Sequence, residues 1–329
     1  MNGNISFGVS LYSFTQQWYE RPGFGFADMF KILRKLGISK FEVVGSQSFD
    51  QYPVPRRESL EELVELSDLY GMTPFSYGGQ IDVGKYTGRE MDAEEIFREV
   101  CDEFRVAQML GCKYLRGTGH LPLSEYERLV EMAERYDIRY GMEIHSPSKP
   151  SDANIQAMAA EIDRIGSSYL GFVPDFGCFI ERPSQKLLNY YKNLGAKMEI
   201  VDYIVKNRHS GKTEEDVWEE VKPMGAGEAD HIAVSELFGH QSFGPADLEG
   251  FKTVLPYSIY FHGKFYDIDE NLVESTIPYD KLIQYILESG FDGVMMTEYE
   301  GHALYTDDAE EQVARHIGMQ KRILKNLIG

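Results

Sequence analysis

The chain has 329 residues, enough for two average domains or for one α/β barrel with insertions. Hydrophobic residues make up 43% and charged residues 26%, a composition that excludes fibrous and disordered proteins. The 53 acidic and 33 basic side chains leave a net charge of −20, which repels nucleic acid and anionic lipid and disfavours a polyanionic substrate, although acidity that only aids solubility is the alternative.

The N-terminal segment MNGNISFGVS lacks a basic region followed by a long apolar stretch, and no later run approaches the roughly 18 apolar residues of a membrane span. The three cysteines, Cys101, Cys112 and Cys178, form no C-x-x-C pair, so neither a disulfide framework nor a thiolate zinc site is indicated. We therefore expect a soluble cytoplasmic protein that binds neither membrane nor nucleic acid.

One pattern recurs along the chain: an amphipathic charged helix, a glycine, a few polar residues and a short apolar strand. FKILRKLGISKFEVVG and LVELSDLYGMTPFSYGG are the first two copies. A left-handed residue commonly ends a helix, and glycine adopts that conformation most easily. The pattern thus predicts helix ends before Gly37, Gly71, Gly111, Gly166 and Gly290, with Asp137 in the same place in a sixth copy.

Counting these strands along the chain gives eight segments: ISFGVSLYS, KFEVVG, TPFSYGG, KYLRGTG, RYGMEIH, LGFVPD, YSIYFHGKF and GVMMTE. Strands separated by helices indicate right-handed βαβ units and a parallel sheet, and eight of them close a (β/α)₈ TIM barrel. An open doubly wound sheet is the alternative, but no G-x-G-x-x-G follows the first strand.

A long interval, about residues 179–255, separates the sixth strand from the seventh. Its sequence reads as helices and loops, so we predict one barrel domain over residues 1–329 with a largely helical insertion at this point. On a TIM barrel this loop lies at the catalytic rim. The insertion can be a lid, a partner surface or an additional helical layer.

Four apolar strands each reach a residue that can bind a metal: Glu143, Asp175, His262 and Glu298. Reactive groups of TIM barrels stand at the C-terminal strand ends, where these four residues lie. A buried carboxylate without a cation is costly or has its pKa shifted until it is neutral, so three converging acids need a metal, a basic partner or exposure. A lone histidine is more often an ordinary core residue. Together, three carboxylates and one imidazole suit Mn²⁺ or Mg²⁺, and Zn²⁺ or Co²⁺ is also possible.

Side chains alternate between the two faces of a strand, which places two further residues beside the proposed ligands. His145 lies one inward position beyond Glu143, where a neutral imidazole can act as a general base, or can simply hydrogen-bond to a ligand. Lys264 has the same relation to His262 and can stabilise negative charge on a substrate oxygen or form a salt bridge with Glu300 at the rim.

Further residues near strand ends are weaker candidates for substrate binding. The aromatic residues after the first strand can stack on a sugar or an aryl group, although aromatic side chains in loops more often serve packing. The candidates are Tyr12, Glu42, Arg116, His120 and Glu300, and the other aromatic residues are Phe14, Trp18 and Tyr19.

At the four proposed ligands, in the motifs MEIH, VPDFG, FHGK and TEYEG, the chain resembles the xylose isomerase-like barrel superfamily of sugar isomerases, epimerases and dehydratases. With the long insertion and the run FHGKFY, it is most similar to the α subunits of bacterial C-glycoside deglycosidases. This resemblance implies Mn²⁺ held by the four residues, His145 as the base, and a small β subunit, with a larger hetero-oligomer possible.

The resemblance also implies a reaction. In a 3-oxo-C-glycoside the ketone acidifies the proton on C2, and its removal allows β-elimination of the aglycone carbon from C1, with a divalent metal stabilising the negative charge. A keto-sugar or inosose isomerase or epimerase shares the first step and is the alternative. An abasic-site endonuclease would need more His and Glu ligands and a basic face, and a structural subunit without activity would not need intact ligands.

Overall fold

The computed structural model describes residues 4–118, 120–240 and 243–329. Its eight strands are β1 (Asn4–Ser10), β2 (Lys40–Val44), β3 (Thr73–Gly78), β4 (Tyr114–Gly117), β5 (Arg139–Ile144), β6 (Leu170–Pro174), β7 (Phe261–Phe265) and β8 (Asp292–Tyr299). All eight correspond to predicted segments. The first ends at Ser10 because Leu11–Phe14 form a 3₁₀ turn, and the seventh begins at Phe261 because Tyr257 ends another 3₁₀ turn and Ser258 forms only an isolated bridge. The end of the fourth predicted segment, residue 119, lies outside the described residues.

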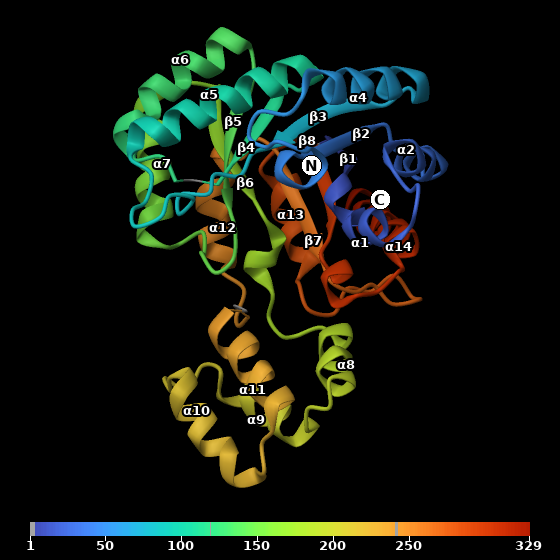
Figure 1. Cartoon of the computed structure of the whole chain (residues 1–329), viewed down its shortest axis with the longest axis vertical. Helices are drawn as coiled ribbons and strands as arrows, with labels where there is room; N and C mark the ends of the chain where they lie inside the picture. Colours follow the sequence, from blue (N-terminus) through green and yellow to red (C-terminus); the bar gives the residue numbers. More distant parts are fainter. Residues whose placement is uncertain (1–3, 119, 241–242) are drawn as a thin grey trace.

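The strands form one parallel sheet in the order β6-β5-β4-β3-β2-β1-β8-β7. The edge strands β6 and β7 meet through two isolated bridges, Phe172 with Ser258 and Asp175 with His262, which nearly close the sheet into a barrel (Figure 1). The predicted TIM barrel is therefore confirmed. The second bridge joins two of the proposed metal ligands through their backbones.

Helices connect the strands and cover the barrel. The first half of the chain contains α1 (Thr15–Glu20), α2 (Phe26–Lys35), α3 (Gly45–Ser48), α4 (Arg57–Tyr70), α5 (Ala93–Leu110), α6 (Tyr126–Tyr136) and α7 (Ala153–Ile165). The second half contains α8 (Gln185–Asn193), α9 (Met198–Asn207), α10 (Glu214–Val221), α11 (Glu228–Val234), α12 (Leu248–Val254), α13 (Tyr279–Glu288) and α14 (Ala309–Ile328). The predicted helix ends are confirmed, since all five glycines and Asp137 have positive φ.

The two faces of each strand belong to different cores. On β5, Tyr140, Met142 and Ile144 point outward and join the large core between the sheet and the helices. Inward-facing Val173, Ile259, Tyr260, Val294 and Met296 fill the barrel interior. Gly141 precedes Glu143 on the inward face of β5. A Cβ at Gly141 would lie 2.5 Å from Val173 Cγ2, so the packed interior leaves no room for a larger residue there. The interior core ends where the polar side chains begin.

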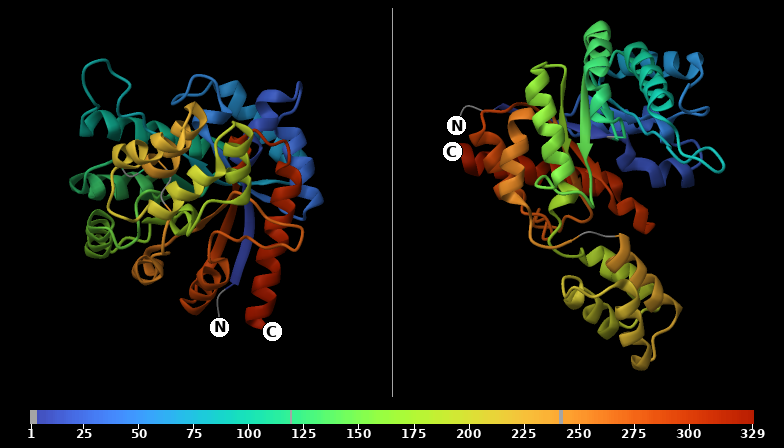
Figure 2. Two further views of the ribbon diagram at one scale, coloured as in Figure 1. Left: turned by 90° about the horizontal axis from the view of Figure 1, so that it is seen from below. Right: turned by 90° about the vertical axis from the view of Figure 1, so that its left-hand side faces the viewer.

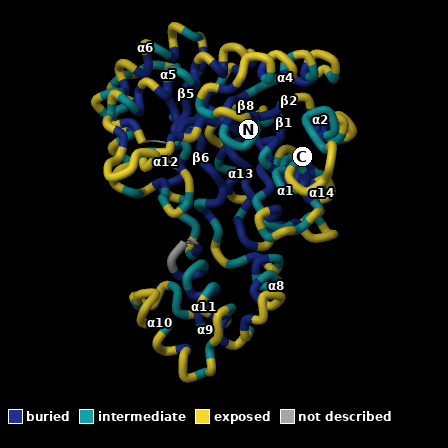
Figure 3. The backbone as a smooth tube through the Cα atoms, in the orientation of Figure 1, coloured by how far each residue is buried: buried dark blue, intermediate teal, exposed yellow. Residues whose placement is uncertain are grey.

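Helices α8 to α11 and the π-helical segment Ser235–His240 form a separate body that extends away from the barrel (Figures 1 and 2). This body has its own core, which includes Tyr191, Ile200, Val217 and Leu237. In Figure 3 its outer surfaces are exposed, whereas the barrel strands are buried. The predicted insertion is thus helical and lies between strands six and seven, but its last helix, α12, packs on the barrel through Phe251.

No helix in the described part of the chain combines the length and the apolar character needed to cross a membrane. The assignment of all 329 residues to one domain stays a prediction.

Candidate metal centre

The four predicted ligands come together at the C-terminal end of the barrel. Glu143 and His262 lie on β5 and β7, Glu298 lies near the end of β8, and Asp175 directly follows β6. One ligand atom from each residue lies within 4.8 Å of the others. Asp175 and His262 are fully buried, and the side chains of Glu143 and Glu298 are almost so. The strands therefore place a compact set of three carboxylates and one imidazole at one end of the barrel.

Among the described residues His262 Nδ1 has no hydrogen-bond partner, and Asp175 Oδ2 has only its 3.0 Å ion pair with Lys264 Nζ. Asp175 uses its other oxygen to accept a hydrogen bond from the backbone N–H of Gly177. His262 Nδ1 lies 3.3 Å from both Glu143 Oε1 and Glu298 Oε2. A buried nitrogen without a hydrogen-bond partner is costly, and a cation between His262 Nδ1 and the neighbouring carboxylates would remove that cost. The donor set also suits a hard divalent ion.

Nearby positive side chains keep two of the three carboxyl groups, those of Glu143 and Glu298, in the ionised form. Burial acts to raise the pKa of Glu143, but Arg116 and His262 lower this pKa to about 2. His262 and Lys264 likewise overcome burial and hold the pKa of Glu298 well below its ordinary value. Asp175 differs, because burial raises its pKa in spite of Lys264.

His262 and Lys264 are affected in the opposite direction. Burial acts to lower the pKa of His262, but Glu42 and Glu298 hold it well above its ordinary value. Burial also acts to lower the pKa of Lys264, and Asp175 and Glu300 overcome this effect, so the amine stays protonated. The neighbouring carboxylates therefore favour the positively charged form of both side chains.

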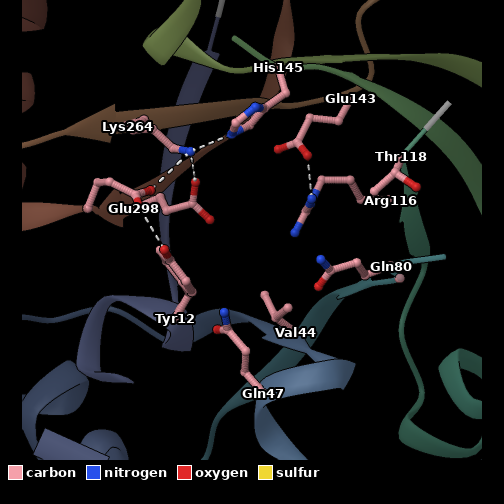
Figure 4. A pocket seen from close by; sticks show the side chains of 12 residues that line it. Tyr12, Val44, Gln47, Gln80, Arg116, Thr118, Glu143, His145, Lys264 and Glu298 are labelled. Carbon is pink, nitrogen blue, oxygen red and sulfur yellow. Dashed lines mark hydrogen bonds and ion pairs between the residues drawn. The ribbon is translucent and has the colours of Figure 1, made fainter. Parts of the chain in front are cut away.

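Lys264 links the proposed ligands to His145 (Figure 4). Its Nζ lies 3.0 Å from His145 Nε2 and 3.0 Å from Asp175 Oδ2, and contacts Glu300 at 3.1 Å. The other ring nitrogen of His145 lies 2.6 Å from the carbonyl oxygen of Ser146. Because a carbonyl can only accept, Nδ1 carries the proton and Nε2 presents its lone pair to the ammonium of Lys264. In this tautomer Nε2 is the hydrogen-bond acceptor of the ring and faces Lys264.

The cavity at this end of the barrel has a volume of about 460 Å³. Tyr12 and Glu300, both predicted to bind substrate, lie in its wall and share a 2.7 Å hydrogen bond. The described residues that line it are Tyr12, Val44, Gln47, Gly79, Gln80, Arg116, Thr118, Glu143, His145, Lys264, Glu298 and Glu300 (Figure 4). Of the polar lining residues, sequence reasoning missed Gln47, Gln80 and Thr118. Each lies just beyond β2, β3 or β4, so the rule that found the ligands also applies to them.

Of the other three predicted substrate-binding residues, Arg116 lines the cavity, whereas Glu42 and His120 are not among its described lining residues. Arg116 forms a 2.6 Å ion pair with Glu143. Glu42 is fully buried below the cavity, and His120 is exposed. Of the aromatic residues after β1, Trp18 packs against Phe26 with ring centroids 4.7 Å apart. The remaining two are Phe14, which is buried, and Tyr19, which is 70% exposed.

Two relatives align with nearly the whole chain. The 3'-dehydrocarminate deglycosidase alpha subunit of Microbacterium sp. is 29% identical over 98% of this chain and 95% of its own length. The C-glycoside deglycosidase alpha subunit of Microbacterium trichothecenolyticum is 26% identical over 89% of this chain and 83% of its own length.

Among solved structures, the D-psicose 3-epimerase of Clostridium cellulolyticum H10 superposes with a TM-score of 0.59 and 10% identity, covering 97% of this chain and 99% of the epimerase. At that identity the likeness concerns the fold alone. The model of the family described as xylose isomerase-like TIM barrel matches residues 30–323, from α2 to the last helix. The chain therefore belongs to the xylose isomerase-like TIM barrel family.

Proposed function

We propose that this chain is the catalytic α subunit of a metal-dependent C-glycoside deglycosidase. The observation that carries the proposal is the cluster of Glu143, Asp175, His262 and Glu298, of which Glu143 and Glu298 line the same cavity as the imidazole of His145. The names of the two relatives, which align over most of the chain, support the choice of reaction within the family.

His262 Nδ1, which has no hydrogen-bond partner among the described residues, and the three carboxylates grouped with it fit a divalent metal, with the four predicted ligands holding it. We propose Mn²⁺, because three carboxylates and one imidazole form a mostly hard set of donors. When bound, such an ion supplies Lewis acidity that stabilises negative charge on the oxygens of a ketone substrate.

In the proposed reaction His145 is the general base. Its Nε2 removes the proton from C2 of a 3-oxo-C-glycoside, which is acidic because the neighbouring C3 is a ketone carbon. The hydrogen bond from Nδ1 to the carbonyl oxygen of Ser146 fixes the ring in the tautomer that this step needs. Nε2 lies 3.0 Å from the Lys264 ammonium, so this hydrogen bond breaks when Nε2 accepts the substrate proton and leaves the ammonium to face the substrate oxygen.

The second step breaks the C1–C bond to the aglycone. The electron pair left at C2 forms the C1=C2 double bond, and the electron pair of the broken bond goes to the aglycone carbon, which takes up one proton. The products are an unsaturated keto sugar and the free aglycone, so no oxidant or reductant is required. Lys264 contacts His145 Nε2 at 3.0 Å and in this scheme stabilises the negative charge that develops on the substrate.

The cavity wall suits a polyhydroxylated substrate. Gln47, Gln80 and Thr118 offer amide and hydroxyl groups that can donate and accept hydrogen bonds. The two relatives are named alpha subunits, and we accordingly propose that this chain also works with a smaller partner subunit.

Incubation of the purified chain and its partner subunit with Mn²⁺ and a 3-oxo-C-glucoside tests the function. We expect release of the free aglycone, followed by chromatography, and loss of that release after chelation of the metal. Conversion of a keto sugar to its epimer or isomer without cleavage of a C-glycoside would contradict the proposal and favour the isomerase alternative.

Replacement of His145 should separate catalysis from metal binding. We expect His145→Ala to retain bound Mn²⁺ but to lose about 10²- to 10⁴-fold in turnover, the usual contribution of a general base. His231→Ala, which removes an exposed histidine of α11, is the matched control. A turnover of H145A equal to that of the control would exclude His145 as the base.

Binding of Mn²⁺ should be coupled to the release of a proton. His262 has its pKa held well above the ordinary value, so it is protonated near neutral pH and must lose a proton to bind a metal. As the pH rises from roughly 6 to 8, His262 loses its proton more easily and Mn²⁺ binds more tightly. The Kd for Mn²⁺ should therefore fall by up to about tenfold for each unit of pH increase.

Titration calorimetry in two buffers of different ionisation enthalpy measures both the Kd and the number of protons released. A Kd that is independent of pH, with equal heats in the two buffers, would show that His262 does not exchange a proton for the metal.

A further inference from the structure

Glu42 is a charged side chain that the proposed reaction does not use. It lies on β2, is fully buried, and is not among the described residues that line the cavity. It is also outside the group of four proposed ligands. Burial of a carboxylate without partners costs much free energy, so Glu42 must have donors that compensate its charge.

Both oxygens of Glu42 are held by donors from several strands. In the sheet register Glu42 lies opposite Ser10 of β1 and Ser76 of β3, so all three side chains point into the barrel. The hydroxyl of Ser76 donates to Oε2 at 2.8 Å, and that of Tyr260 donates to the same oxygen at 2.8 Å. Ser10 donates to Oε1 at 3.3 Å. Three hydroxyl groups therefore hold the carboxylate in position, and none of these contacts depends on a bound metal.

The same Oε2 lies 3.1 Å from His262 Nε2. Because a carboxylate can only accept, Nε2 must carry a proton. When the imidazole is neutral its lone pair is then on Nδ1, the nitrogen that lies 3.3 Å from Glu143 Oε1 and Glu298 Oε2 and has no hydrogen-bond partner among the described residues. Glu42 thus sets both the orientation of the ring and the nitrogen that is free to bind.

A purely structural role, in which Glu42 balances the charge of Arg116, fits the distances less well. Arg116 Nη2 is 3.5 Å from Glu42, whereas its Nη1 is 2.6 Å from Glu143. The guanidinium therefore has its shorter contact with Glu143, and the contact of Glu42 with His262 is shorter than its contact with Arg116.

We propose that Glu42 is a positioning residue that orients His262 as a ligand through its Nδ1 and thereby sets the affinity of the site for a divalent metal. This inference rests on the proposed metal-dependent function. A carboxylate that accepts a hydrogen bond from a ligating histidine fixes the tautomer and increases the basicity of the other ring nitrogen, and its loss typically reduces metal affinity by about 10- to 100-fold.

The test uses Glu42→Gln in the full-length chain, with Glu103→Gln as the matched control. Glu103 is also fully buried and hydrogen-bonded to a tyrosine, Tyr52, but none of its described hydrogen bonds or ion pairs involves a proposed ligand. Mn²⁺ affinity is measured by calorimetry, the visible absorption of the Co²⁺-loaded protein reports the ligand field, and circular dichroism without metal reports folding.

We expect E42Q to stay folded, to bind Mn²⁺ about 10- to 100-fold more weakly than the parent and to show a shifted Co²⁺ spectrum, whereas E103Q behaves as the parent does. Parental affinity and an unchanged spectrum in E42Q would overturn the inference while leaving the proposed function intact. A parent chain that fails to bind Mn²⁺ would contradict the proposed function and the inference with it.

If E42Q does not fold, Tyr260→Phe provides the decisive measurement. This substitution removes one neutral donor from the oxygen that accepts from His262 and keeps the aromatic ring in the interior core. We expect Y260F to weaken Mn²⁺ binding by about 2- to 10-fold, as the loss of one buried hydrogen bond would. Unchanged affinity in Y260F would overturn the inference in that case.

Discussion

The site depends on one electrostatic constraint: several carboxylates lie close together at the buried end of the barrel. Five carboxylates, those of Glu42, Glu143, Asp175, Glu298 and Glu300, surround one guanidinium and one ammonium at the end of the barrel. In a region largely shielded from water such a group is stable only with compensating positive charge. Arg116, Lys264 and a protonated His262 supply part of this charge in the protein alone, and a divalent cation would supply more while releasing a proton from His262.

Strand alternation explains how the barrel carries this charge without losing its core. Outward-facing residues such as Met142 pack against the helices, and inward-facing residues such as Val173 and Met296 fill the barrel below the site. One or two inward positions further along the same strands the side chains become polar. Glu42 connects the two regions, because it accepts a hydrogen bond from Tyr260 of the interior core and contacts the proposed ligand His262.

The sequence predicted the features that follow from repetition and from strand direction. Left-handed helix ends recur at fixed places before the strands, which made the eight-stranded barrel predictable, and parallel strands bring their ends to one face, which made the convergence of Glu143, Asp175, His262 and Glu298 predictable. The ends of the first and seventh strands were less predictable, because apolar residues in 3₁₀ turns resemble those of a strand.

Depth within the barrel was harder to predict from sequence. Glu42 and His120 were both assigned to substrate binding, but Glu42 lies below the cavity and His120 lies in an exposed loop, since strand position alone does not give distance from the cavity. The helical body after β6 was predicted as an insertion, yet the sequence did not show that α12 packs on the barrel. That distinction depends on contacts between residues far apart in the chain.

Metal content of the purified chain is the most direct test of the central claim, that the four strand-end residues hold one divalent cation. After loading with Mn²⁺ and dialysis, elemental analysis should find about one Mn²⁺ per chain, and Asp175→Asn should lose most of it because a carboxylate ligand is removed. Less than about half an ion in the parent chain, or equal content in D175N, would contradict the claim.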